Sequence, residues 1–273
     1  MQTAANISAK AHNDLMKFAR SLKAPFYEYQ LKAFLESNFF NQGATDLAYP
    51  SIVAGGSNGT ILHYTQNNAA VEANELILVD AGCEYNGYAS DITRTFPASG
   101  KFSEIQKTVY SIVLEAQKAA IELAKPGTTI EEVHQAAVNA LVDGIVSEKL
   151  IHKYPNPEQD NEYIHNPTKD EILEKELYRC YYMHRTSHFI GLDVHDVGSY
   201  YKDQKPRALE PGMVITIEPG LYFDIDADYL DDHLKGLAVR IEDDVFIETS
   251  GNLVLSKNAV KEVSEIEALE TLG

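Results

Sequence analysis

The stretch LILVDAGCEYNGYASDITRTF, residues 76–96, constrains the fold more than any other part of the chain. Asn86-Gly87 stands between two runs of strand-forming residues. An Asn-Gly pair in that setting is the strongest short signal for a two-residue hairpin of type I′. We therefore expect an antiparallel hairpin whose turn lies at these two residues.

Each arm of the predicted hairpin carries an aspartate. With the turn at the Asn-Gly pair, Asp80 lies opposite Thr93 and Asp91 lies opposite Gly82, so the two aspartates are diagonal neighbours on one face. Such neighbours lie about 7–8 Å apart at the backbone, close enough for carboxylates to converge on the same ions. We expect Gly82 to leave space beside Asp91. The alternative is a pair of exposed acids, but Asp80 ends an apolar run, where an unbound charge is costly.

Further candidate ligands follow residue 180. The segment MHRTSHFIGLDVHDVG contains three histidines, TIEPG places a glutamate directly after an apolar strand, and VRIEDDV places another in a second strand. Each has an ordinary explanation when taken alone, such as packing or a solvated turn. Together with the aspartates they supply four carboxylates and at least one imidazole, which suits manganese, cobalt or zinc, and four negative charges match two divalent cations. These candidates are His184, His188, His195, Glu218 and Glu242.

The rest of the chain mixes helices with strands. Apolar residues at helical spacing and two capping boxes predict the longer helices. The last hundred or so residues form strands and loops before a short acidic helix. In chain order, helices are predicted over residues 5–22 and 27–41, from Ser103 to Pro126-Gly127, from Thr129 to about Leu150, and near 262–270.

Composition limits the partners and the compartment. The net charge of −18 argues against nucleic acid or an anionic membrane surface, since both require basic protein surface. The sequence contains no run of about 18 apolar residues that would span a membrane. The start MQTAANISAK lacks the features of a signal peptide, and the two cysteines are expected to be reduced thiols. We therefore expect a cytoplasmic protein.

The ordered candidates resemble the metal ligands of a known family. Asp80, Asp91, His188, Glu218 and Glu242 are similar, in order and in flanking residues, to the five ligands of the pita-bread metallopeptidases, which include methionine aminopeptidase, prolidase and creatinase. The segments ILHY, DAGCEYNGYASDITRTFP, LEPGMVITIEPGLY and VRIEDDV resemble the aminopeptidase P branch. The resemblance runs from about residue 5 to residue 270. It implies an α+β pita-bread fold, in which helices cover a curved antiparallel sheet.

The resemblance also implies an activity. It points to a dinuclear-metal aminopeptidase that hydrolyses the bond between an N-terminal residue and a following proline, with manganese as the expected ion and cobalt or zinc as alternatives. Glu218 would also act as general base or proton shuttle. His63 and His195 would hold the scissile carbonyl and stabilise the tetrahedral intermediate. The residues around the substrate and the ligand shell would be His184, Tyr222 and Arg240.

Three other functions stay open at this stage. A prolidase would cut only Xaa-Pro dipeptides, and creatinase-type chemistry would act on non-peptide amides. A pita-bread domain without catalysis could serve as a peptide-binding or protein-binding module. Methionine aminopeptidase has a similar length, but its last glutamate lacks the VRIEDD setting found here.

Three departures from the family pattern affect these expectations. Residues 1–273 are predicted to form a single catalytic domain without the usual amino-terminal domain, so a homodimer is possible but open. A polar segment near 151–170 is predicted to be a surface insertion. Arg185-Thr186 follows His184 where the family usually has small or apolar residues. This change is expected to reshape the pocket for the residue after the scissile bond.

Overall fold

The predicted helices form close to their expected positions. The computed structural model describes residues 1–271. Both capping boxes are present, with Ser103 accepting from the Gln106 N–H and Thr129 from the Glu132 N–H. Within the described residues, no helix combines the length and apolar character needed to cross a membrane. The helices are α1 (Gln2–Ser21), α2 (Glu28–Asn41), α3 (Glu104–Leu123), α4 (Ile130–Ser147), α5 (Lys169–Glu174) and α6 (Val263–Ala268), with 3-10 turns η1 (Gly56–Thr60) and η2 (Leu177–Cys180).

Helices α4 and α5 differ from expectation. Helix α4 ends at Ser147 instead of near Leu150, because Lys149 adopts a positive φ of 54°, which an α-helix cannot contain. Helix α5 was not predicted from the sequence. It begins with a capping box between Thr168 and Glu171, at the end of the polar segment.

Short antiparallel strands make up the sheets. The two that carry most of the site have the strand orders β3-β5-β8 and β13-β16-β17, and β14 pairs with β15. The strands are β1 (Phe26–Tyr27), β2 (Asp46–Leu47), β3 (Ile52–Gly55), β4 (Ala70–Val71), β5 (Leu76–Asp80), β6 (Cys83–Tyr85), β7 (Tyr88–Ala89), β8 (Thr93–Pro97), β9 (Lys153–Pro155), β10 (Tyr163–His165), β11 (Tyr201–Lys202), β12 (Lys205–Pro206), β13 (Val214–Ile217), β14 (Gly220–Tyr222), β15 (Ala238–Arg240), β16 (Asp243–Ile247) and β17 (Asn252–Val254).

The Asn-Gly hairpin has the predicted turn and register. Asn86 and Gly87 have φ values of 51° and 83°, the positive values that a type I′ turn requires. Tyr85 pairs with Tyr88, and Asp80 pairs with Thr93, as the turn position implied. The register is therefore continuous from β6–β7 into β5–β8.

Gly82 has a different role from the one predicted. A Cβ atom at Gly82 would lie 1.7 Å from the carbonyl oxygen of Ser90, so the two arms approach too closely for any side chain there. The expectation that Gly82 mainly leaves space beside Asp91 is wrong. Its absent side chain instead allows close backbone contact directly before Asp91.

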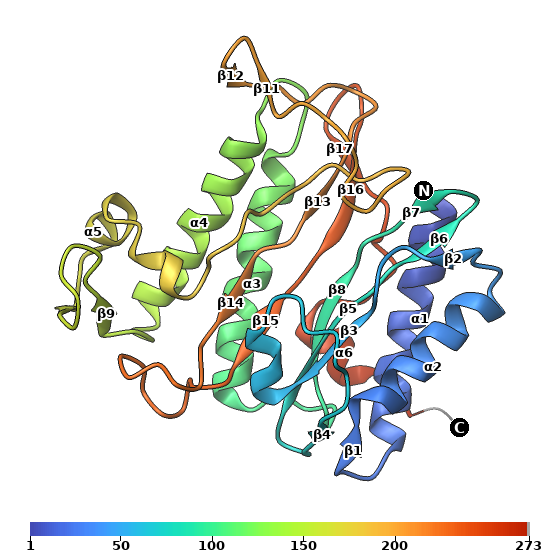
Figure 1. Cartoon of the computed structure of the whole chain (residues 1–273), viewed down its shortest axis with the longest axis horizontal. Coiled ribbons are helices and arrows are strands. Elements are labelled where there is room, and N and C mark those ends of the chain that lie inside the picture. The colour runs from blue at the N-terminus through green and yellow to red at the C-terminus, as the bar shows by residue number, and fades with distance from the viewer. Residues whose placement is uncertain (272–273) are drawn as a thin grey trace.

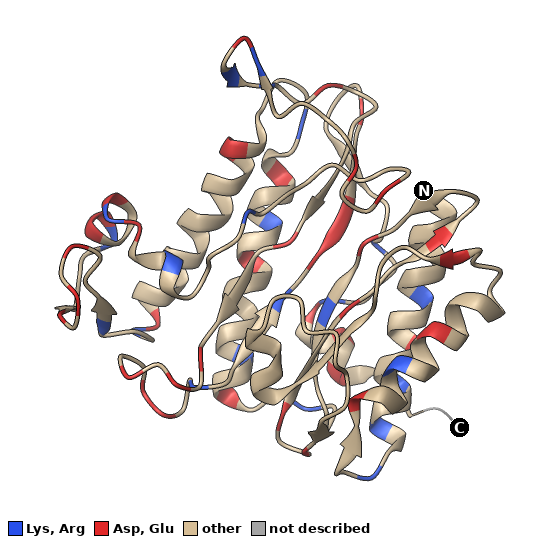
Figure 2. Ribbon diagram, in the orientation of Figure 1, with Lys and Arg blue, Asp and Glu red and all other residues tan. Residues whose placement is uncertain are grey.

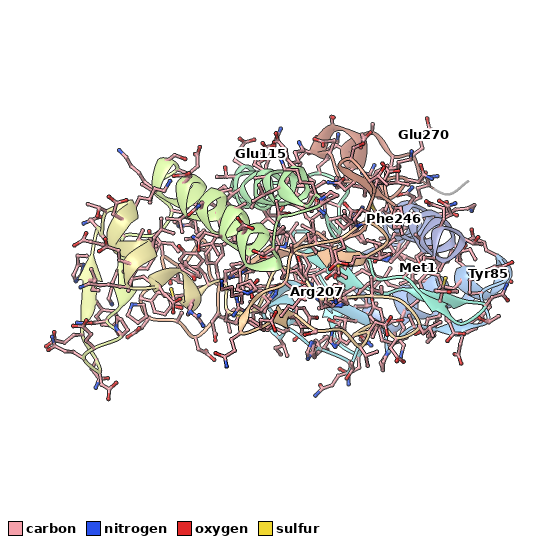
Figure 3. All side chains as sticks on the ribbon, turned by 90° about the horizontal axis from the view of Figure 1, so that it is seen from above. Met1, Tyr85, Glu115, Arg207, Phe246 and Glu270 are labelled. Carbon is pink, nitrogen blue, oxygen red and sulfur yellow. The ribbon has the colours of Figure 1, made fainter. Side chains whose placement is uncertain are left out.

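Two halves of the molecule meet along strands β8 and β15. Thr95 bridges them, since its hydroxyl donates to the Arg240 carbonyl and accepts from the Arg240 N–H. The Glu242 N–H donates to the Thr93 carbonyl at 3.0 Å. Figure 1 shows α1 and α2 beside one half and α3 and α4 beside the other. In the view turned by 90°, α3, α4 and α6 lie on one side of the strands, and Glu115 of α3 lies on that helical side (Figure 3).

The polar segment near 151–170 forms a hairpin of β9 and β10 next to α5, at the edge of the molecule in Figure 1. Most of its residues are exposed or half-buried, but Tyr154 is 1% exposed and belongs to the main core. The segment is therefore held to the fold by at least one buried aromatic side chain.

Candidate active site

The candidate ligands lie where strands end. Asp80 is the last residue of β5, and Asp91 precedes β8 across the hairpin. Glu218 directly follows β13, and Glu242 lies between β15 and β16. Strand ends place side chains at the junction of the two halves while the apolar strands behind them fill the core. Figure 2 shows acidic residues at β16 in the middle of the ribbon, whereas most others lie on outer helices and loops.

The two aspartates converge as the hairpin register predicted. The hydroxyl of Tyr49 lies 2.6 Å from Asp80 Oδ1 and 2.5 Å from Asp91 Oδ1. One hydroxyl can contact both carboxylates only if they lie on the same side of the hairpin. The alternative of two separate exposed acids is excluded, since Asp91 is only 5% exposed.

His188, Glu218 and Glu242 complete the group. His188 Nε2 lies 3.4 Å from Asp91 Oδ2 and 3.5 Å from Glu218 Oε1. One ligating atom each from Asp91, His188 and Glu242 lie within 4.8 Å of one another. Residues separated by more than 150 positions therefore meet with oxygen and nitrogen atoms facing a common centre.

Buried neighbours hold the ligands in place. Thr93 donates its hydroxyl to Glu242 Oε2 at 2.6 Å, and the Arg240 guanidinium donates to Asp80 Oδ2 at 2.7 Å. Asp244 accepts the backbone N–H of Asp91 at 3.2 Å. Such contacts fix the orientation of ligating side chains. Arg240 thus orients the carboxylate of Asp80.

The electrostatics of the cluster favour cations. Burial, followed by the negative charges of Asp91, Glu218 and Asp80, raises the pKa of Glu242 well above its usual value. Burial also raises the pKa of Glu218 to about 8 and raises that of Asp80. Crowded carboxylates with raised pKa values have to bind protons or cations. Four carboxylates and one imidazole form a donor set that fits divalent cations with borderline or hard character.

Histidines line the cavity above this cluster. The cavity has a volume of about 230 Å³ and includes His63, His184 and His195 in its wall together with all five candidate ligands. His184 Nε2 lies 2.7 Å from the Tyr222 hydroxyl, which also accepts from Arg240 at 3.0 Å. The rings of His188 and His195 are 4.3 Å apart in an edge-on arrangement. Every residue proposed from the sequence therefore lies in the cavity wall or, in the case of Tyr222, directly behind it.

Sequence reasoning missed three parts of the site. Tyr49 lies in a short segment, AYPSI, that carries no motif, so no sequence signal identified it. Thr93 could have been found, because the hairpin register places it opposite Asp80. No sequence signal indicated the role of Asp244, because its position two residues after Glu242 does not reveal its contact with Asp91.

Tyr49 gives a first testable prediction. We expect Tyr49→Phe to weaken the affinity for manganese by roughly tenfold, because partners of ligating groups typically contribute about 10- to 100-fold to metal affinity. Isothermal titration of the metal-stripped protein with manganese measures the change. Tyr27→Phe, at an exposed tyrosine on β1, is the matched control. An unchanged affinity in Tyr49→Phe would show that the hydroxyl does not support the ligands.

Comparison with known proteins places the chain among metallopeptidases. Residues 1–249 match the model of metallopeptidase family M24. The chain is 42% identical to Xaa-Pro aminopeptidase of Escherichia coli (strain K12) over 98% of its length, and that alignment covers 57% of the relative. It is 36% identical to human Xaa-Pro aminopeptidase 3, covering 98% of this chain and 49% of the relative.

Solved structures agree. Aminopeptidase PepP of Pseudomonas aeruginosa superimposes with a TM-score of 0.90 at 44% identity, covering 98% of this chain and 57% of that one. A variant of Escherichia coli aminopeptidase P solved in complex with substrate superimposes with a TM-score of 0.88 at 42% identity, with the same coverage. The predicted α+β pita-bread fold is confirmed. The chain spans 49–57% of the length of these relatives, and it belongs to metallopeptidase family M24.

Proposed function

We propose that the chain is a dinuclear-metal Xaa-Pro aminopeptidase, which releases the first residue of a peptide whose second residue is proline. The observation that carries this proposal is the convergence of Asp80, Asp91, His188, Glu218 and Glu242 at the base of a cavity walled by three further histidines. The similarity to proteins named Xaa-Pro aminopeptidase supports the choice of substrate.

The five convergent residues would hold two divalent cations. Bound there, the cations would act as Lewis acids toward the scissile carbonyl and would activate water at neutral pH. We propose manganese as the ion, with cobalt or zinc as alternatives that the same donor atoms accept. The neighbours Tyr49, Thr93 and Arg240 would keep the carboxylates aimed at the cations.

Glu218 is the proposed proton carrier. Its Oε1 atom lies 3.4 Å from the Thr216 hydroxyl, and its Oε2 atom lies 3.8 Å from His184 Nδ1. Burial raises the pKa of Glu218 to about 8 before cations bind, and cations would lower it again. A carboxylate tuned by its surroundings in this way can accept a proton from water and deliver it to the leaving amine.

His63 and His195 are proposed to contact the carbonyl of the first residue. Both are exposed in the cavity wall, where they can donate an N–H to an oxygen that gains negative charge during attack. His184, Tyr222 and Arg240 form a hydrogen-bonded chain beside them. Burial lowers the pKa of His184 to about 3, so its ring is neutral, and its single N–H, on Nδ1, donates to the Arg185 carbonyl.

The proposed substrate bond explains why a shaped cavity is required. The bond before proline has no N–H, and the ring fixes φ, so a peptidase cannot hold this bond through its amide hydrogen. Contacts to the carbonyl oxygen and to the shape of the ring have to replace that hydrogen bond. A cavity of about 230 Å³ gives room for the reacting dipeptide unit while the rest of a peptide extends outside.

Peptide turnover tests the proposed function. With manganese added, we expect release of arginine from an Arg-Pro-Pro peptide, and we expect no comparable release from Arg-Ala-Pro. Cleavage of the Arg-Pro dipeptide but not of the tripeptide would instead identify a prolidase. No turnover of any proline peptide by protein with bound metal would contradict the proposal and favour a binding module.

Further properties stay predictions. We propose that residues 1–273 act as one catalytic unit and that the partners are peptides with proline at the second position. A cytoplasmic location is proposed on the grounds given by the sequence, which leaves open whether the chain forms a homodimer. Sedimentation of the purified chain decides the oligomeric state.

A further inference from the structure

Arg185 lies in the wall of the same cavity as the candidate ligands. It directly follows His184 and its side chain is exposed, whereas Asp91 and Glu242 at the base of the cavity are only 5% and 2% exposed. A chain with a net charge of −18 generally repels anions. The guanidinium of Arg185 therefore places a positive charge at the mouth of the cavity, where it can attract an anion despite the negative net charge of the chain.

The backbone on both sides of Arg185 is well fixed. The Arg185 carbonyl oxygen lies 2.8 Å from His184 Nδ1. Thr186 is fully buried, and its hydroxyl contacts His134 Nδ1 at 2.7 Å and the Tyr182 hydroxyl at 2.5 Å. The Thr186 carbonyl also accepts the N–H of Glu218 at 2.8 Å. The departure Arg185-Thr186 is thus built into the site, with Thr186 anchored inside and Arg185 facing the cavity.

The guanidinium of Arg185 has no acidic partner within the described chain. Across residues 1–271, no carboxylate oxygen lies within 4.0 Å of it, and its nitrogens make no hydrogen bond to a protein atom. The side chains of the other arginines are occupied. The ion pairs are Arg94 with Asp243, Arg179 with Glu176, Arg207 with Glu210 and Arg240 with Asp80. Arg20 donates to main-chain carbonyls.

A second polar group beside Arg185 also lacks a partner. Ser187 is 5% exposed and lines the same cavity, and its hydroxyl makes no hydrogen bond to any described residue. Buried hydroxyls are normally satisfied. An unpaired guanidinium and an unpaired, buried hydroxyl therefore lie two positions apart in the segment that lines the cavity.

We propose that Arg185 forms a subsite for a substrate carboxylate on the carboxyl side of the proline, an inference that rests on the proposed function. An exopeptidase that removes the first residue has to let the rest of the peptide leave through the cavity mouth. Arg185 is exposed at that mouth, so it meets the carboxyl side of the peptide and repels a positive group there. The carboxylate can come from the free end of a dipeptide or from an acidic side chain at the third position.

Matched peptide pairs separate these two sources. The first pair is Ala-Pro with a free carboxylate and Ala-Pro amide. The second pair is Ala-Pro-Asp amide and Ala-Pro-Asn amide, which differ only in the charge of the third side chain. For the manganese-loaded chain we expect kcat/KM to be about five- to tenfold higher for the charged member of at least one pair. The reason is the charge-assisted hydrogen bond that the Arg185 guanidinium would donate to the carboxylate.

Substitutions at Arg185 then assign the preference. We expect Arg185→Gln to bring the charged-to-neutral ratio close to one, Arg185→Lys to keep part of it, and Arg185→Glu to reverse it. Arg179→Gln is the matched control, because Arg179 is exposed and pairs with Glu176 away from the cavity. A ratio near one in the unaltered chain for both pairs would overturn the proposal, as would a ratio that Arg185→Gln leaves intact.

Binding without turnover keeps this test independent of the proposed activity. Calorimetric titration compares Pro-Asp amide with Pro-Asn amide, and proline with proline amide, on the manganese-loaded chain and on Arg185→Gln. A preference for the carboxylate that disappears in Arg185→Gln supports the subsite even if no peptide is cleaved, in which case only the proposed function fails. Turnover of neutral peptides without any such preference would retain the function and overturn the subsite.

Discussion

Asp91→Asn is expected to lose bound metal and to lose peptidase activity with it. The Asp91 side chain faces His188, Tyr49 and Glu242, so it stands at the centre of the donor cluster. Asparagine keeps the shape but removes the negative charge that offsets a cation. Residues that only support a ligand contribute up to about 100-fold to metal affinity. Because Asp91 is itself a proposed ligand, we expect its substitution to lower the metal affinity by more than about 100-fold.

Elemental analysis after dialysis against manganese measures this change. The unaltered chain should retain two ions, and Asp91→Asn fewer. Asp232→Asn, which removes the same charge from a side chain that is 96% exposed, is the control and should bind metal as before. If Asp91→Asn retained two ions with unchanged affinity, the assignment of this aspartate would be wrong.

Glu218→Gln is expected to lower kcat by roughly a thousandfold. General acid–base catalysis contributes about 10²- to 10⁴-fold, and glutamine keeps an oxygen in place but cannot accept the proton. Because Glu218 is also a proposed ligand, metal content has to be measured on the same sample. Reconstitution at high manganese concentration then separates proton transfer from metal loss.

The control for this substitution is Glu210→Gln, at an exposed glutamate that pairs with Arg207. We expect its kcat to match that of the unaltered chain. A Glu218→Gln protein that bound two ions and kept kcat within about tenfold would rule out Glu218 as the proton carrier.

Local chemistry made much of the fold predictable. The Asn86-Gly87 turn needs only two residues with positive φ, and once it is set, hydrogen bonding fixes the register that places Asp80 opposite Thr93. The capping boxes at Ser103 and Thr129 likewise depend on residues three positions apart. Each of these signals is contained in a few neighbouring residues.

Contacts between distant segments were less predictable. The pairing of Arg240 with Asp80 and the contact of Tyr49 with both aspartates join residues far apart in the sequence, and no spacing rule connects them. Such contacts depend on how the elements pack, which local patterns do not contain.

Anomalous diffraction from crystals of the manganese-loaded chain, collected near the manganese absorption edge, shows directly where cations bind. The proposed two-metal site predicts two anomalous peaks, about 3.5–4 Å apart as in other two-metal sites, within coordination distance of Asp80, Asp91, His188, Glu218 and Glu242. Peaks elsewhere, or no peak at this cluster, would contradict it.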